Sequence, residues 1–203
     1  MARTRRHLEA TAHHEAGHAA AYILTGRKFK HVTIKPGEDY FGRVLSQHPA
    51  WFGRAMNDPE LKNRLRRYIE DRVIILSAGN VAERFFEKRR IVAGAGSDWI
   101  NTFELLEHGS CGLEEVSTYH AWITARTRSL ILRPDVWGGV SAMAAALMDQ
   151  ETLSYNEAER IYHEAALAIT GPRFEAIRRE IVDYRKKHPL RMRECEWQAI
   201  ERK

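Results

Sequence analysis

His14, Glu15 and His18 combine the residue types of a metal-dependent hydrolase. The two imidazoles stand four residues apart, and a carboxylate directly follows the first of them. On an α-helix four residues turn about 400°, so His14 and His18 lie one above the other, roughly 6 Å apart along the axis. Two such side chains can bind one zinc ion, whereas Glu15 points about 100° away and suits a base that acts on water at the metal. The spacing therefore predicts a His-Glu-x-x-His zinc site in which Glu15 is the catalytic residue.

The motif needs a helix to carry it, and the surrounding residues predict one. Residues 8–25 are rich in alanine, and Gly26 follows as a plausible end of the helix. A solvent-exposed helix whose histidines are merely hydrated is the competing interpretation.

A catalytic zinc site of this kind needs a third protein ligand. The metzincin pattern is excluded, because Ala21 and Leu24 stand where that pattern requires glycine and histidine. Asp98 follows a glycine-rich stretch at the start of an expected helix, and from the residues alone we favour a helix N-cap for it. The third ligand thus stays open at this point, and the other acidic candidates are Glu83, Glu87 and Glu104.

The remaining patterns predict a mainly α-helical fold with a small β-hairpin or sheet beside the metal-binding helix. Alternation over residues 30–35, a turn at 36–39 and a return over 40–45 indicate the hairpin. Asp58 and Pro59 indicate the start of a long packing helix. We expect helices over residues 61–87, 98–107, 114–132, 135–150, 155–170 and, beyond Gly171-Pro172, to about 187. These elements suggest a domain over residues 1–170 and a basic helical C-terminal extension over residues 171–203.

Composition limits the class of protein and its partners. The chain has 203 residues, of which 44% are hydrophobic and 29% charged, as in ordinary soluble proteins. No apolar run approaches the roughly 20 residues of a membrane span, and the basic N-terminus lacks the apolar core of a signal peptide, so we expect a cytoplasmic protein without membrane contact. Cys111 and Cys195 predict neither a disulfide framework nor a cysteine zinc site. The net charge is +5, but the basic residues are spread over several expected helices in which acidic residues are interleaved. We therefore do not expect the protein to bind nucleic acid.

Several stretches together resemble the peptidase domain of the FtsH family, the AAA+ ATP-dependent zinc metalloproteases. The run Thr11–Ala19 is similar to the family's zinc motif, and the other similar stretches follow in the same order. They are His31–Pro36, Ser77–Phe86, Ala93–Asp98 and Glu151–Ser154. The resemblance covers roughly residues 14–159.

The resemblance implies a helical peptidase domain in which an aspartate completes the zinc site. Residue by residue, His14 and His18 match the two imidazole ligands, Glu15 the catalytic glutamate and Asp98 the aspartate ligand. The resemblance thus reverses our interpretation of Asp98. One zinc ion per chain and a polypeptide substrate are implied as well.

The departures from the family are equally informative. The sequence contains no Gly-x-x-x-x-Gly-Lys-[Ser/Thr] phosphate loop, and residues 109–118 do not follow the family's pattern. We therefore expect a zinc endopeptidase that acts on unfolded or flexible polypeptides without its own ATPase, and we leave open a homo-oligomer and a separate ATPase partner. The alternative is a catalytically inactive binding or regulatory protein that keeps the fold, and the intact Glu15 argues against it.

Overall fold

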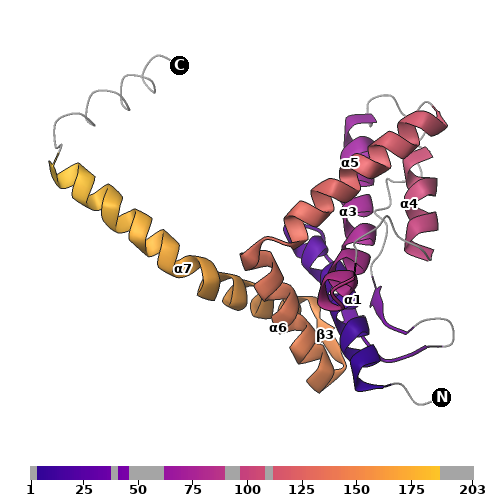
Figure 1. Cartoon of the computed structure of the whole chain (residues 1–203), viewed down its shortest axis with the longest axis horizontal. Coiled ribbons are helices and arrows are strands. Elements are labelled where there is room, and N and C mark those ends of the chain that lie inside the picture. Colours follow the sequence, from indigo (N-terminus) through magenta and orange to yellow (C-terminus); the bar gives the residue numbers. More distant parts are fainter. Residues whose placement is uncertain (1–3, 38–40, 46–61, 90–96, 108–111, 188–203) are drawn as a thin grey trace. The chain divides into compact units, whose positions relative to one another are not determined.

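The protein is mainly helical, as the sequence predicts, with one small antiparallel sheet (Figure 1). The structure is a computed structural model that describes residues 4–37, 41–45, 62–89, 97–107 and 112–187. Within these residues the helices are α1 (Arg5–Leu24), α3 (Lys62–Phe86), α4 (Ser97–Glu107), α5 (Leu113–Ile131), α6 (Pro134–Gln150) and α7 (Tyr155–Lys187). The chain divides into two compact units, Met1–Ala166 and Leu167–Lys203.

Helix α1 is the central element of the first unit. The side chain of Thr4 accepts a hydrogen bond from the backbone N–H of His7, so the helix begins three residues before the predicted start. Gly26 has a φ of 68°, the left-handed conformation that ends many helices, which confirms the predicted stop. Helix α1 packs against both α3 and α6 (Figure 1).

Small residues let α1 approach its neighbours closely. The side chains of Ala12, Ala16 and Ala19 are fully buried in the core. Helix α3 contributes larger aliphatic side chains to the same core, among them Ile69 and Val73. Helix α3 also packs against α4 and α5, so it joins the two sides of the first unit.

The small sheet has the strand order β2-β1-β3, with both pairs antiparallel. Its strands are β1 (His31–Thr33), β2 (Arg43–Leu45) and β3 (Thr152–Ser154). Strands β1 and β2 both contact α1, so the small sheet predicted beside the helix that carries His14 and His18 is confirmed. The third strand was not predicted, because three residues between two helices are too few for an alternating pattern to show.

Helix α7 begins with a capping box and passes through a proline. Ser154 Oγ lies 2.6 Å from the Glu157 carboxylate, which also accepts the backbone N–H of Ser154 at 2.8 Å. We expected Gly171-Pro172 to separate two helices, but α7 continues through both residues. Proline removes one i→i−4 hydrogen bond, and the helix is still able to continue on either side of it. In the second unit, Leu167 and Ile169 are exposed.

Some sequence-based expectations fall outside the described residues. These are the Asp58 N-cap and the glycine-rich turn before Ser97. Within the described residues, none of the helices combines the length and the apolar character that crossing a membrane requires.

Candidate metal centre

The metal centre is built on the contact between α1 and α3. A methyl group on Gly17 would lie 2.6 Å from the carbonyl oxygen of Ala78 and 2.7 Å from Cβ of Ala82, so the two backbones nearly touch there. Gly79, the residue after Ala78, faces His14 and His18 of α1. A methyl group on Gly79 would lie 2.8 Å from Nε2 of His14 and closer still to Nε2 of His18. The glycines therefore leave room for the imidazoles and for an ion between them.

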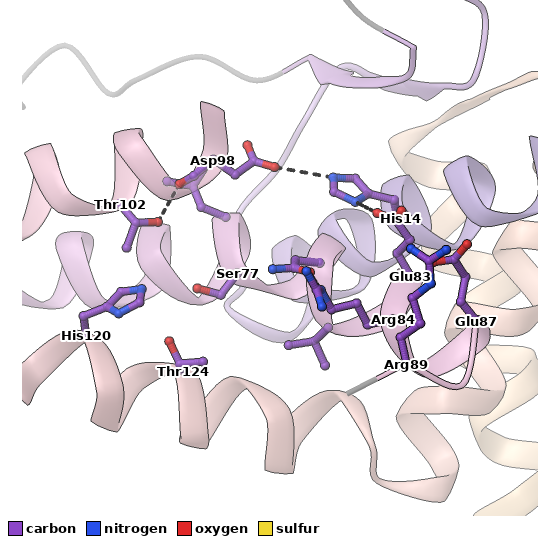
Figure 2. Close-up of a pocket in the computed structure, with 13 residues that line it drawn as sticks. His14, Ser77, Glu83, Arg84, Glu87, Arg89, Asp98, Thr102, His120 and Thr124 are labelled. Atoms are coloured by element: carbon purple, nitrogen blue, oxygen red, sulfur yellow. Dashed lines mark hydrogen bonds and ion pairs between the residues drawn. The ribbon is translucent and has the colours of Figure 1, made fainter. Parts of the chain in front are cut away.

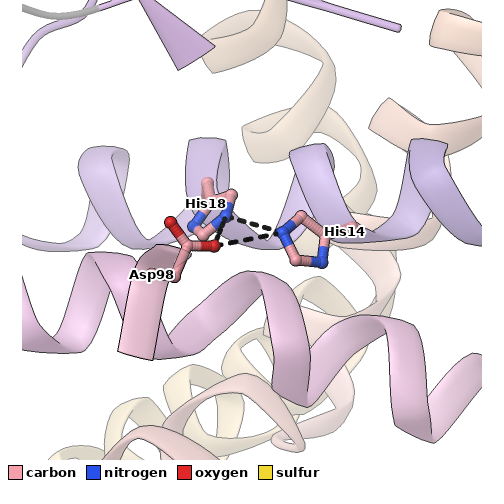
Figure 3. Close-up of side chains that lie close together, drawn as sticks. All are labelled: His14, His18 and Asp98. Atoms are coloured by element: carbon pink, nitrogen blue, oxygen red, sulfur yellow. Dashed lines mark hydrogen bonds and ion pairs between the residues drawn. The ribbon is translucent and has the colours of Figure 1, made fainter. Parts of the chain in front are cut away.

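Three potential ligand atoms converge from α1 and α4, one each from His14, His18 and Asp98 (Figure 3). The Nε2 atoms of His14 and His18 are 3.0 Å apart, and Oδ2 of Asp98 lies 3.4 Å from the first and 3.3 Å from the second. Three ligands of one tetrahedral zinc ion, each about 2.0–2.1 Å from the metal, are themselves about 3.3 Å apart. The group formed by His14, His18 and Asp98 could therefore hold a metal ion with little rearrangement.

The other nitrogen of each ring shows which atoms face the centre. Nδ1 of His18 lies 2.6 Å from the carbonyl oxygen of Ile75, and Nδ1 of His14 lies 2.8 Å from a carboxylate oxygen of Glu83. Both partners can only accept, so both Nδ1 atoms carry hydrogen, and each ring in its neutral form directs the lone pair of Nε2 inward. Two lone pairs and a carboxylate at such short range repel one another unless a cation lies between them.

Helix α4 brings Asp98 to this point. The helix begins at Ser97, so Asp98 lies in its first turn and not at the residue before it, where an N-cap stands. The hydroxyl of Thr102 donates to the backbone carbonyl of Asp98 at 2.7 Å, which fixes this turn. The carboxylate of Asp98 points at the histidines (Figure 3).

The other acidic candidates lie elsewhere. Glu83 contacts the far nitrogen of His14, so it orients that ring and does not join the ligand group. Glu87 pairs with Arg89 at 3.2 Å, and Glu104 is exposed. Among the described residues, Asp98 alone completes a group with the two histidines.

Without a metal, the centre holds a proton instead. Burial lowers the pKa of His14, but hydrogen bonds with Asp98 and Glu83 outweigh burial and raise that pKa to about 10. Burial would raise the pKa of Asp98, yet the hydrogen bonds with the two histidines hold it well below its usual range. The hydrogen bond with His14 likewise lowers the pKa of Glu83. A divalent cation at the centre would replace this proton.

Glu15 is buried beside the centre, with 6% of its surface exposed. A methyl group on Gly42 would lie 2.6 Å from both Cγ and Oε1 of Glu15, so the chain entering β2 passes directly over this carboxyl group. Burial raises the pKa of Glu15, while the charges of His18 and His14 oppose that shift. A carboxylate held in such a site is a stronger base than an exposed one.

A cavity of about 170 Å³ opens at the metal centre (Figure 2). His14, Glu83 and Asp98 line it together with residues that sequence reasoning missed as site residues, notably His120 and Thr124 of α5. The spacing of these two at i and i+4 places them on one helix face, but sequence alone gave no sign that this face meets the metal centre.

Comparisons with known proteins do not place the chain in a protein family. No protein-family model matches the sequence, and no curated protein matches it either.

Proposed function

We propose that the protein is a zinc-dependent metalloendopeptidase of FtsH type. The single observation that carries this proposal is the convergence of His14 Nε2, His18 Nε2 and Asp98 Oδ2 at 3.0 to 3.4 Å, with both Nδ1 atoms held by acceptors. Two imidazoles and one carboxylate form a ligand set that zinc takes in catalytic sites, with a fourth position left for water or substrate.

In the proposed peptide hydrolysis, different residues hold the metal, move the proton and orient the ligands. Bound zinc would supply a Lewis acid that polarises the scissile carbonyl and makes water more acidic. Glu15 takes a proton from the attacking water and delivers it to the leaving amine. Glu83 holds the ring of His14 in the tautomer that binds metal, and the carbonyl of Ile75 does the same for His18.

The proposed substrates are unfolded or flexible polypeptides. No phosphate loop occurs in these 203 residues, so the proposal assigns them no ATP-driven unfolding of a stable substrate. A separate ATPase that delivers substrate, and a homo-oligomer, are both compatible with this proposal.

The test is metal analysis combined with cleavage of casein. We expect about one zinc ion per chain, loss of cleavage on chelation and recovery when zinc is restored. A protein that takes up no zinc, or that takes up zinc and cleaves nothing, contradicts the proposal. The second of these outcomes would favour the inactive binding protein.

A further inference from the structure

The wall of the cavity away from Glu83 carries uncharged polar side chains that face the cavity without a partner. His120 and Thr124 come from α5, and Ser77 comes from α3 (Figure 2). His120 is only 7% exposed, and Thr124 Oγ1 is fully buried with no hydrogen-bond partner. Within the part of the chain that the structure describes, neither the imidazole nitrogens of His120 nor the hydroxyl of Ser77 forms a hydrogen bond; Phe103 contacts the ring of His120 at 5.1 Å between centroids.

Such groups favour a polar ligand over an apolar one. A buried donor or acceptor that loses water without gaining a partner costs about 1–3 kcal/mol. Burial lowers the pKa of His120, so its imidazole is neutral and offers one donor and one acceptor, as each hydroxyl does. An apolar side chain in this cavity would leave all three groups without partners.

Charged groups of both signs line the other end of the cavity, so a charged ligand finds no patch of a single sign there. Three carboxylates line the cavity, those of Glu83, Glu87 and Asp98. The two arginines that also line it are already engaged, Arg89 with Glu87 at 3.2 Å and Arg84 with the side-chain oxygen of Asn80 at 2.7 Å. A ligand with both donors and acceptors and no net charge fits this environment.

The cavity belongs to the metal centre, because His14 and Asp98 form part of its lining. Its volume of about 170 Å³ suits a single side chain, since pockets for drug-sized ligands begin near 300 Å³. A polypeptide held at the metal would place the side chain next to its scissile bond at the mouth of this cavity.

We propose that this cavity is the specificity pocket of the peptidase and that it receives a carboxamide side chain, that of Asn or Gln, beside the scissile bond. The inference rests on the proposed function for the presence of a metal and of a peptide substrate. Ser77, His120 and Thr124 are the residues that determine specificity, through hydrogen bonds to the amide oxygen and the amide N–H₂ group.

The test uses binding and not turnover. Two peptide hydroxamates, identical except for one side chain next to the hydroxamate, are titrated calorimetrically into the zinc-loaded full chain. One carries a carboxamide side chain and the other an isobutyl side chain. We expect the carboxamide compound to bind at least about tenfold more tightly.

Variants show whether the named residues cause the preference. Thr124→Val keeps the side-chain shape, and His120→Phe keeps a ring of similar size, and each should reduce the preference by about tenfold. Thr127→Val is the matched control on the same helix, since Thr127 is buried but its hydroxyl already donates to the carbonyl of Ile123 at 2.9 Å. The control should keep the preference of the parent protein.

The outcomes separate this inference from the proposed function. Equal binding of the two compounds, tighter binding of the isobutyl compound, or a preference that survives both pocket variants overturns the specificity pocket and leaves the zinc peptidase standing. A chain that binds no zinc overturns both. A carboxamide preference in a protein that cleaves no peptide supports the pocket and contradicts the peptidase.

Discussion

At the scale of the residue, the hydrogen-bond acceptors behind the histidines define the centre as much as the ligands do. The carbonyl of Ile75 and the carboxylate of Glu83 each hold an Nδ1–H group, which leaves the two Nε2 atoms directed at Asp98. A carboxylate behind a ligand histidine also makes the imidazole a better donor to a metal.

Asp98→Asn tests the third ligand. Asparagine retains the shape of the side chain and is favourable near a helix start, but it is a poor and uncharged zinc ligand. We expect this variant to lose most of its zinc, measured by metal analysis after dialysis. Zinc content equal to that of the parent would remove Asp98 from the centre.

Glu83→Gln tests the role of the acceptor behind His14. Glutamine can still accept from Nδ1 but carries no charge, so zinc affinity should fall about 10- to 100-fold in a competition titration with a chelator. Glu87→Gln is the matched control, because Glu87 lines the same cavity but pairs with Arg89. If the two variants bind zinc equally well, Glu83 does not support the ligand.

At the scale of the element, close packing of α1 on α3 sets the space for the ion. Gly17 and Gly79 both lie in this contact, yet an added methyl group would meet different atoms at the two positions. At Gly17 it meets the backbone of Ala78, and at Gly79 it meets the ends of the two ligand histidines.

Two glycine-to-alanine variants should therefore have different consequences. Gly79→Ala occupies the space proposed for the ion, so zinc binding should be lost, and the metal-free protein should lose less stability than with Gly17→Ala because the methyl group meets side chains and not backbone atoms. Gly17→Ala pushes two backbones apart and should destabilise the metal-free protein by about 1–3 kcal/mol. Chemical denaturation and a zinc titration measure both. Normal zinc binding by Gly79→Ala would contradict the geometry of the centre.

Features of the site that depend on local spacing could be predicted from the sequence, and features that depend on packing between elements could not. The i, i+4 spacing of His14 and His18 was sufficient to predict two ligands on one helix face, because helical periodicity alone determines it. Asp98 was different, since the residues favoured an N-cap and only the family resemblance suggested a ligand. Its position depends on packing between helices far apart in sequence, which no local pattern encodes. For the same reason β3, Glu83 as the partner of His14, and the face formed by His120 and Thr124 were not predicted.

At the scale of the whole molecule, the described site residues all belong to the unit Met1–Ala166. The proposed peptidase chemistry requires a flexible polypeptide that can reach a small buried centre. The chain's own 203 residues carry no phosphate loop with which to unfold a substrate.

We therefore expect ATP neither to bind the isolated chain nor to accelerate casein cleavage, and we expect a tightly folded protein to survive incubation. Calorimetry with ATP and a gel-based degradation assay measure these results. Rapid degradation of the folded protein without ATP would show that substrates need no unfolding, and stimulation that appears only with a separate ATPase would reveal a partner in trans.

Casein cleavage by Glu15→Gln, measured at the same zinc content as the parent, tests the central claim most directly. The variant keeps the three ligands and loses only the base, so we predict one zinc ion per chain in both proteins and turnover in the variant at or below about 1% of the parent's. Equal turnover in the two proteins at equal zinc content would contradict the claim that Glu15 and this centre form a peptidase.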